Sequence, residues 1–156
     1  MSISHKLAKY LEQEKVGFEA LKHPLTYTAS ETAGSQHVPG RQMIKSVIIN
    51  ADGKLHMCVV TAEHFIDFDK LKTVLSAKEV QLAKEQEFVK LFPDYALGAE
   101  PPFGHLYGLR VIMDKIIEKN HDIAFNAGTH TDIVKMKLKD YLRLENPTIA
   151  DISTHI

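Results

Sequence analysis

The sequence predicts an α+β fold whose mixed, mainly antiparallel and partly barrel-like sheet is flanked by helices. Segments with helical and strand periodicity are interspersed without strict βαβ alternation, and a clear hairpin signal lies in the first half. A length of 156 residues is that of one domain, and no repeat, low-complexity stretch or linker divides the chain. We therefore expect a single domain over residues 1–156.

The N-terminal segment predicts a helix followed by a short strand. Apolar residues at helical spacing lie on one face of this helix: Ile3, Leu7, Tyr10 and Leu11. Ser2 or Ser4 can cap its beginning, and we expect Gly17 to end it. Residues 18–21 alternate apolar and polar side chains as a strand does, and Pro24 discourages a helix after them.

A β-hairpin is the clearest pattern in the chain. Two runs rich in strand-forming residues, 43–49 and 55–60, are separated by a turn that contains Asp52 and Gly53, and glycine tolerates the positive φ that such turns need. Both faces of the first run are apolar, so we expect it to be covered on both sides. A short helix is expected before the hairpin, between residues 28 and 40.

The second half alternates helices and strands around one stiff loop. A helix is expected over residues 67–75, with Asp67 as its cap, and another over residues 78–92, which Pro93 stops. The loop at residues 98–104 follows. Further strands are then predicted at 109–113, 122–125 and 133–138. A last short helix is expected over residues 139–145, and we expect the tail after Pro147 to be loose.

Composition excludes several classes of protein. The chain is 44% hydrophobic and 25% charged with a formal net charge of -1, so no strong field attracts nucleic acid or membrane, and any RNA contact must be local or weak. The single cysteine, Cys58, cannot form an internal disulfide. The N-terminus does not resemble a signal peptide, and no apolar run approaches the roughly 20 residues that span a bilayer. We expect a cytoplasmic protein without a membrane partner; its oligomeric state is left open.

Lys45 is the most unusual residue, because it lies within a strand that is apolar on both faces. An unpaired buried ammonium is costly, so the side chain must either extend to water or line a polar pocket. In the first case Lys45 is an ordinary lysine near the beginning of a strand. In the second it is a cation placed for a phosphate or a polarised carbonyl.

Two glycine-containing segments are further candidates for a site. Gly128 suits a tight turn whose backbone N–H groups can hold an oxyanion, and His130 beside it can donate a hydrogen bond or move a proton. The loop from Gly98 to Gly104 contains two adjacent prolines that stiffen it, and glycine allows a ligand close to the backbone. Both segments are equally compatible with ordinary surface turns.

Familiar catalytic motifs are absent from the sequence. The nine histidines show no His-Glu-x-x-His spacing, and with one cysteine no Cys-x-x-Cys exists, so no metal site is predicted. Cys58 lies in an apolar run and is expected in the core. Neither a Gly-x-Ser-x-Gly elbow nor a phosphate-binding Walker loop occurs.

Several segments, in this order and spacing, resemble the YbaK/prolyl-tRNA synthetase-associated (editing insertion) domain family, in particular its free-standing members. They are Gly40-Arg-Gln-Met-Ile-Lys-Ser-Val-Ile-Ile49 with the hairpin and residues 59–68 after it, Gly98-Ala-Glu-Pro-Pro-Phe-Gly104, and Asp122-Ile-Ala-Phe-Asn-Ala-Gly-Thr-His-Thr131 with residues 139–143. The resemblance implies an aminoacyl-tRNA deacylase that acts in trans on the 3′ end of mischarged tRNA. A synthetase partner is possible, and no metal or organic cofactor is implied.

The resemblance also assigns roles to residues. Lys45, Gly128 and His130 match the family's catalytic positions. The substrate-binding residues that it implies are Ser46, Pro101, Pro102, Phe103, Gly104, Asn126, Ala127 and Thr129. Strand alternation points Ser46 to the opposite face from Lys45, so the sequence leaves open whether Ser46 lines the pocket.

A chemical hypothesis follows from these roles. An activated ester needs positioning, an oxyanion site and an aimed water, which Lys45, the Gly128 backbone amide and His130 can supply. A neighbouring ribose hydroxyl of the substrate is expected to take part in the proton transfer. Alanine, serine and threonine are the amino acids expected to be removed, and pocket size would discriminate among them. The alternatives are a binding module of the same fold that does not hydrolyse its ligand, and a hydrolase of another small acyl ester.

Overall fold

A computed structural model describes residues 5–22, 39–93, 95–96 and 98–155 of the chain. Its strands form a five-stranded sheet in the order β5-β2-β3-β6-β9, a three-stranded sheet β1-β8-β7 and a two-stranded sheet β10-β4. The strands are β1 (Phe18–Lys22), β2 (Ile44–Ala51), β3 (Lys54–Thr61), β4 (His64–Ile66), β5 (Val80–Leu82), β6 (Arg110–Asp114), β7 (Asp122–Asn126), β8 (Asp132–Lys137), β9 (Thr148–Ala150) and β10 (Ser153–His155).

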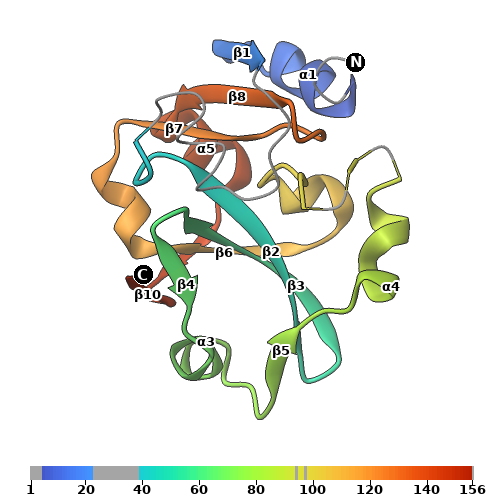
Figure 1. Ribbon diagram of the computed structural model, residues 1–156, viewed down its shortest axis with the longest axis vertical. Coiled ribbons are helices and arrows are strands. Elements are labelled where there is room, and N and C mark those ends of the chain that lie inside the picture. The colour runs from blue at the N-terminus through green and yellow to red at the C-terminus, as the bar shows by residue number, and fades with distance from the viewer. Residues whose placement is uncertain (1–4, 23–38, 94, 97, 156) are drawn as a thin grey trace.

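Helices cover the sheets. They are the α-helices α1 (His5–Gln13), α3 (Phe68–Leu75), α4 (Glu85–Phe88) and α5 (Leu138–Glu145), and the 3₁₀ helices η1 (Val89–Leu91), η2 (Gly104–Tyr107) and η3 (Lys115–Lys119). Figure 1 shows the three-stranded sheet at one end of the molecule and the β2–β3 hairpin running from it towards the other end. The predicted α+β class with a mixed, mainly antiparallel sheet is confirmed, although the strands in the described part of the chain do not close into a barrel.

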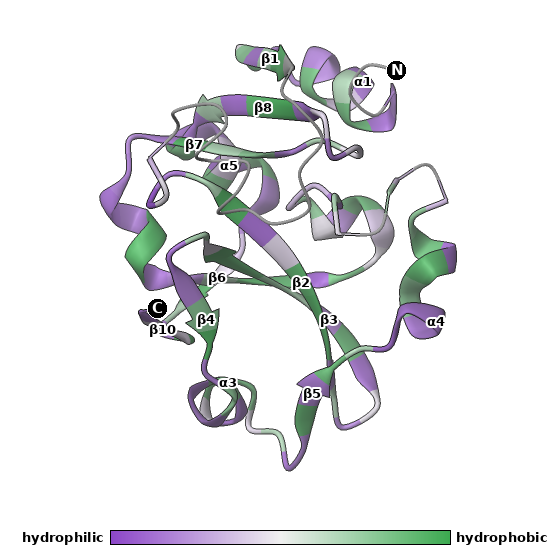
Figure 2. Cartoon of the chain, in the orientation of Figure 1, coloured by the Kyte–Doolittle hydropathy of each residue, from purple (hydrophilic) through white to green (hydrophobic). Residues whose placement is uncertain are grey.

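The predicted hairpin is confirmed. Strands β2 and β3 pair antiparallel from Ile44 opposite Thr61 to Ala51 opposite Lys54. Asp52 and Gly53 both take positive φ, 51° and 87°, as a two-residue turn matched to strand twist requires. Side chains on the two faces of β2 enter two different hydrophobic clusters, so the strand is covered on both sides as expected. Figure 2 shows that β3 and β6 are hydrophobic for most of their length.

A bridge joins the two larger sheets at the beginning of β2. Met43 pairs with Ala124 of β7 in parallel orientation, and the Ala124 N–H donates to the Gln42 carbonyl over 2.9 Å. Both strands leave this bridge in the same direction. Lys45 and Asn126 each follow it by two residues, on the same faces as Met43 and Ala124 respectively. The bridge therefore brings the segment of Lys45 to the end of β7.

The helix expected over residues 78–92 is wrong in its first part. Residues Val80–Leu82 form strand β5, which pairs antiparallel with β2 at a sheet edge. The Asp52 carboxylate accepts the N–H of Lys78 over 3.0 Å and that of Glu79 over 2.8 Å, which holds the segment against the hairpin. Pairing with an otherwise open strand edge outweighs the helical propensity of the segment.

The tail after Pro147 is ordered, contrary to expectation. Strand β9 extends the large sheet beside β6, β10 pairs with β4, and Ile152 between them is fully buried. Two smaller differences concern the N-terminus. Helix α1 ends at Gln13, and Lys15 rather than Gly17 adopts positive φ. The expected caps Ser2 and Ser4 and the expected helix between residues 28 and 40 lie mainly or wholly outside the described residues.

The other predicted elements are confirmed with small shifts of their ends. Asp67 caps α3, and its carboxylate accepts the backbone N–H groups of Asp69 and Lys70, each over 3.1 Å. Helix α5 begins at Leu138, one residue before its expected beginning. None of the helices in the described part of the chain is long and apolar enough to cross a membrane.

Candidate functional site

Lys45 is half-buried on β2 and lies in an apolar pocket. The pocket has a volume of 340 Å³ and is lined by Lys45, Val47, Val60, Phe65, Ile66, Phe68 and Leu82. Within the described residues, no acidic side chain forms an ion pair with the Lys45 ammonium and no acceptor hydrogen-bonds it. Burial lowers the pKa of the Lys45 amine below its ordinary value. A cation that is partly desolvated without a described counter-charge is suited to an anionic or polarised ligand.

Ser46 lies on the opposite face of β2 from Lys45. Its cross-strand neighbour is Val59, which belongs to the same cluster as Ile44, Phe103 and Phe125. The Ser46 hydroxyl is buried and has no hydrogen-bond partner in the described part of the protein. Such a group costs folding free energy unless a water or a ligand satisfies it.

The turn after β7 is tied to the loop that begins at Gly98. The Ala96 N–H donates to the Gly128 carbonyl over 2.8 Å, and the Gly128 N–H donates to the Ala99 carbonyl over 2.9 Å. Gly128 takes a positive φ of 97°, which explains the glycine. In this fold the Gly128 N–H is thus used within the protein, and the oxyanion role expected for Gly128 stays a prediction. The next N–H along the turn, that of Thr129, has no acceptor among the described residues.

His130 lies against the same loop. A Cβ atom placed on Gly98 would be 3.4 Å from His130 Cε1, so a larger residue at position 98 would press on the imidazole. Glu100 is 94% buried there, and its Oε1 accepts the Gly98 N–H over 3.2 Å. Burial raises the pKa of the Glu100 carboxyl, while the nearby His130 opposes this rise. Glu100 was not among the site residues predicted from the sequence. The available signal was its position directly before the two prolines of the loop from Gly98 to Gly104.

Asn126 and Thr129 differ in how their side chains are satisfied. Asn126 is half-buried, and its Oδ1 is buried without a hydrogen-bond partner among the described residues. The Thr129 hydroxyl donates to the Asp132 carboxylate over 2.5 Å and also contacts the Thr131 hydroxyl. Asn126 therefore offers an unused acceptor at the end of β7, whereas Thr129 holds the turn together.

The Pro-Pro-Phe-Gly loop serves the core as well as the site. Phe103 is fully buried and packs edge-on against Phe125 and Tyr141. Gly104 permits close packing, because a Cβ there would lie 2.6 Å from Val111 Cγ2. Both prolines and Ala127 are buried too. Phe103 and Gly104 thus have a packing role in the core, and the substrate-binding role expected for them stays a prediction.

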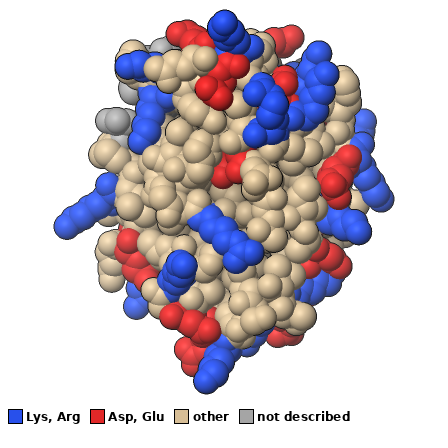
Figure 3. Space-filling model, turned by 180° about the vertical axis from the view of Figure 1, so that it is seen from behind, with Lys and Arg blue, Asp and Glu red and all other residues tan. Residues whose placement is uncertain are grey.

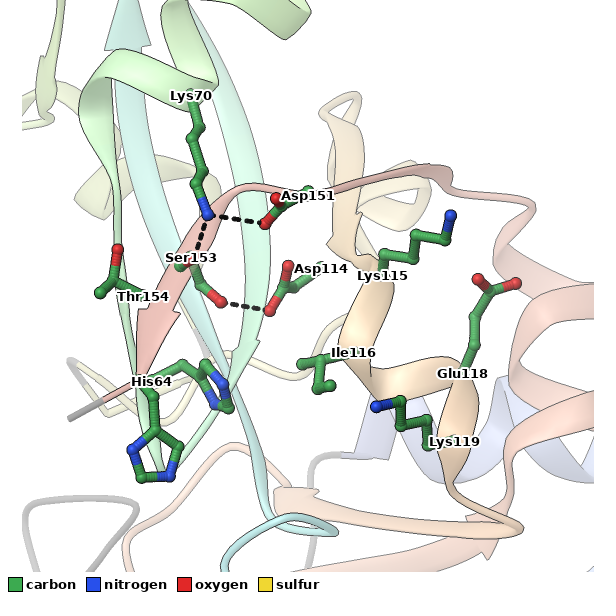
Figure 4. Close-up of a pocket in the computed structure, with 11 residues that line it drawn as sticks. His64, Lys70, Asp114, Lys115, Ile116, Glu118, Lys119, Asp151, Ser153 and Thr154 are labelled. Carbon is green, nitrogen blue, oxygen red and sulfur yellow. Dashed lines mark hydrogen bonds and ion pairs between the residues drawn. The ribbon is translucent and has the colours of Figure 1, made fainter.

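A larger pocket, of 690 Å³, lies beside β10 and η3 and contains none of the predicted site residues. Figure 4 shows that part of its lining is joined by polar contacts: the Lys70 ammonium donates to Asp151 over 3.1 Å, and Ser153 donates to Asp114. The pocket therefore contains a network that holds the C-terminal strand in place.

Charge is evenly distributed on one face of the molecule. Figure 3 shows basic and acidic side chains interspersed over this face, its middle included, with uncharged surface between them. Within the described residues, no three His, Cys, Asp or Glu side chains gather as metal ligands. Cys58 is fully buried, and burial raises the pKa of its thiol to about 12, which removes it as a nucleophile.

Comparison with known proteins gives one family. A family model described as "aminoacyl-tRNA editing domain" matches residues 23–144. The chain is 27% identical to the "Multifunctional Ser/Thr-tRNA deacylase ProXp-y" of Escherichia coli (strain K12), over 96% of this chain and 93% of that protein. It is 29% identical to a segment of the proline–tRNA ligase of Bacillus subtilis (strain 168), over 76% of this chain and 21% of the ligase.

A solved structure shares the fold over nearly the whole length. A crystal structure described as a candidate trans-editing enzyme for prolyl-tRNA synthetase superimposes with a TM-score of 0.82 at 22% identity, covering 98% of this chain and 99% of that one. At this identity the likeness shows the architecture alone.

Proposed function

This chain belongs to the aminoacyl-tRNA editing domain family, and from that premise we propose that it is a trans-editing deacylase that removes serine or threonine from mischarged tRNA. Alanine remains a third candidate. The observation that carries the proposal is the position of Lys45, a partly desolvated cation beside the strand that ends in the Gly128–His130 turn. The full-length match to a free-standing deacylase supports action in trans.

The reaction is the hydrolysis of an ester. Water adds to the carbonyl carbon, the acyl C–O bond breaks, and the ribose oxygen leaves with a proton to give tRNA and a free amino acid. The Lys45 ammonium holds the terminal phosphate or polarises the carbonyl. We assign the developing oxyanion to the Thr129 N–H, because Gly128 already donates to Ala99.

His130 and Asn126 complete the proposed site. His130 orients the attacking water, and the Glu100 carboxylate beside it supports the imidazole. Asn126 Oδ1, a buried acceptor without a described partner, receives the ammonium of the aminoacyl group. No described side chain other than His130 is placed as a base, so a neighbouring ribose hydroxyl is proposed to relay the proton.

Selection between amino acids rests on size and on hydrogen bonding. A single methylene changes binding by only about 1–3 kcal/mol, so a site that accepts serine also tolerates threonine or alanine. Ser46 supplies a buried hydroxyl without a described partner, and we propose that it contributes to this selection from the opposite side of β2.

The partner is the 3′ end of tRNA. A net charge of -1 favours a weak and transient complex, so delivery by a synthetase is compatible with the proposal. Since aminoacyl-tRNA is made and used in the cytoplasm, we propose that the protein acts there.

The test is deacylation of tRNAs that carry Ala, Ser, Thr, Cys or Pro. Wild type is compared with Lys45→Ala and with Lys54→Ala, a matched change of an exposed lysine on the neighbouring strand. Loss of Ser or Thr that needs Lys45 and not Lys54 supports the proposal. Absence of hydrolysis at concentrations that still bind tRNA would instead favour the binding-module alternative.

A further inference from the structure

The pocket around Lys45 opens onto an unusually exposed aromatic ring. Phe65 on β4 and Leu82 on β5 are each 58% exposed, more than any other large hydrophobic side chain in the described part of the chain. Both line the same pocket as Lys45, with Val47 and Val60 from the strands between them. Exposing two large apolar side chains at the rim of one concave site is costly, and such patches mark binding surfaces.

The chemistry of this pocket is that of a nucleotide site. An aromatic face stacks on a nucleobase whatever its sequence, aliphatic side chains pack against the sugar, and a cation holds the phosphate. Lys45 is the cation that lines the pocket. A purely apolar partner, such as a second copy of this chain or a hydrophobic peptide, would bury the Lys45 ammonium against hydrocarbon with no counter-charge.

Lys45 also connects the pocket to the proposed reaction centre. It follows the Met43–Ala124 bridge by two residues, and β7 leads from that bridge to Asn126 and the turn. A ligand whose phosphate lies on Lys45 can therefore extend one way over Phe65 and the other way to the turn. The 3′-terminal nucleotide of an aminoacyl-tRNA has this layout, with a base at one end and the scissile ester on its ribose.

From these observations we propose that Phe65 is the stacking platform for the terminal adenine of the tRNA, and that Leu82 forms the apolar wall of the same subsite. The inference rests on the proposed deacylase function and deepens it. Phe65 does not touch the reacting atoms; it fixes the nucleoside so that the ester reaches the turn. It is thus a substrate-binding residue for the proposed reaction.

The first experiment compares kcat/KM on Ser-tRNA for wild type, Phe65→Leu and Phe65→Tyr. Leucine keeps the apolar bulk and loses the π-face, so we expect a fall of about ten- to hundredfold, whereas tyrosine keeps the ring and stays near wild type. Ile149→Ala is the matched control, because Ile149 is also an exposed hydrophobic residue and lies on β9, outside the pocket. It should leave the rate unchanged.

A substrate with an abasic terminal nucleotide completes the cycle. The kcat/KM of wild type should fall on the abasic substrate by about the same factor as the kcat/KM of Phe65→Leu falls on normal Ser-tRNA. For Phe65→Leu, removal of the base should cause no further fall. If wild type and Phe65→Leu deacylate Ser-tRNA equally fast, the proposed stacking role of Phe65 is wrong, while the deacylase function stands.

A binding assay separates the two proposals when no hydrolysis is seen. The chain has no tryptophan, so Phe65→Trp introduces a single tryptophan, which can be excited selectively, at the rim of the pocket. The trinucleotide CCA should quench it, CC with an abasic 3′ end should quench it less, and Ile149→Trp should not respond. Quenching with an inactive wild type would keep the nucleotide subsite and reject the deacylase. If the emission of the tryptophan at position 65 changes with protein concentration and not with added CCA, the pocket binds a second copy of the chain, and the inference is overturned.

Discussion

The hydroxyl of Tyr141 donates a hydrogen bond to the carbonyl of Pro102 over 2.6 Å, inside the core. This bond joins α5 to the Pro-Pro-Phe-Gly loop, and the Phe103 ring packs against the same tyrosine. Burial raises the pKa of the Tyr141 phenol well above its ordinary value, so the hydroxyl stays protonated and able to donate. The rigidity of the loop thus depends on a residue about forty positions later in the sequence.

Tyr141→Phe should lower the stability of the fold by about 1–3 kcal/mol, because it leaves the buried Pro102 carbonyl without a donor. Urea unfolding followed by circular dichroism measures this. Tyr107→Phe is the comparison: its half-buried hydroxyl donates to the Tyr95 hydroxyl and not to a buried carbonyl, so its loss should cost less. Equal stabilities of Tyr141→Phe and wild type would mean that water replaces the lost donor.

Lys45→Met should abolish deacylation while leaving the fold at least as stable as wild type. Burial lowers the pKa of the Lys45 amine, so the unfolded chain binds this proton more tightly than the folded chain does. The stability of wild type therefore rises as pH increases from the folded pKa towards the unfolded pKa. Methionine removes the free-energy cost of desolvating the ammonium and keeps an apolar side chain of similar length. A kcat/KM loss of more than about a hundredfold, with a melting temperature that does not fall, is the expected pair of results. A variant that unfolds would show that Lys45 is structural.

Glu100 should give the reaction an acid-sensitive limb. Its raised pKa means that the carboxylate is lost at a higher pH than for an exposed glutamate, and with it the support of His130. We expect the kcat/KM of wild type to fall as pH decreases through that pKa, and that of Glu100→Gln to be lower and flat. Glu12→Gln, an exposed change on α1, should keep the wild-type profile.

The same shift fixes the sign of a stability effect. A raised folded pKa contributes stability that is fully present below the unfolded pKa and is lost as pH rises through the folded pKa. At neutral pH Glu100→Gln should therefore be at least as stable as wild type, and its advantage should vanish in acid.

His130→Ala should lower kcat/KM for deacylation about ten- to hundredfold, as expected for the loss of one hydrogen bond.

Ser46→Ala and Ser153→Ala should change stability in opposite directions. The buried Ser46 hydroxyl has no partner among the described residues, so alanine should be neutral or stabilising by up to about 1 kcal/mol. Ser153 donates to the buried Asp114, and its removal should destabilise by about 1–3 kcal/mol. If Ser46 contacts the aminoacyl group, Ser46→Ala should also change the ratio of kcat/KM for Ser-tRNA and Thr-tRNA.

Local patterns in the sequence determined much of the architecture. The β2–β3 hairpin, the Asp67 cap and the burial of Cys58 depend on interactions between near neighbours or on alternation, and each prediction is confirmed. The family could also be predicted, because segments with moderate specificity occur in the right order, and the family match confirms it. The individual roles of the predicted site residues stay predictions.

Tertiary structure decided the rest, for reasons that no local pattern contains. Residues 80–82 became a strand because β2 offered a free edge, and the C-terminal tail became ordered because β6 and β4 offered edges too. The N–H of Gly128 donates to the carbonyl of Ala99, a residue 29 positions earlier, which no local pattern predicts. The burial of Glu100 beside His130 and the place of Phe65 at the rim of the Lys45 pocket also follow from tertiary contacts alone. Contacts between distant residues set edge pairing, hydrogen-bond satisfaction and desolvation, and these quantities exist only in the folded chain.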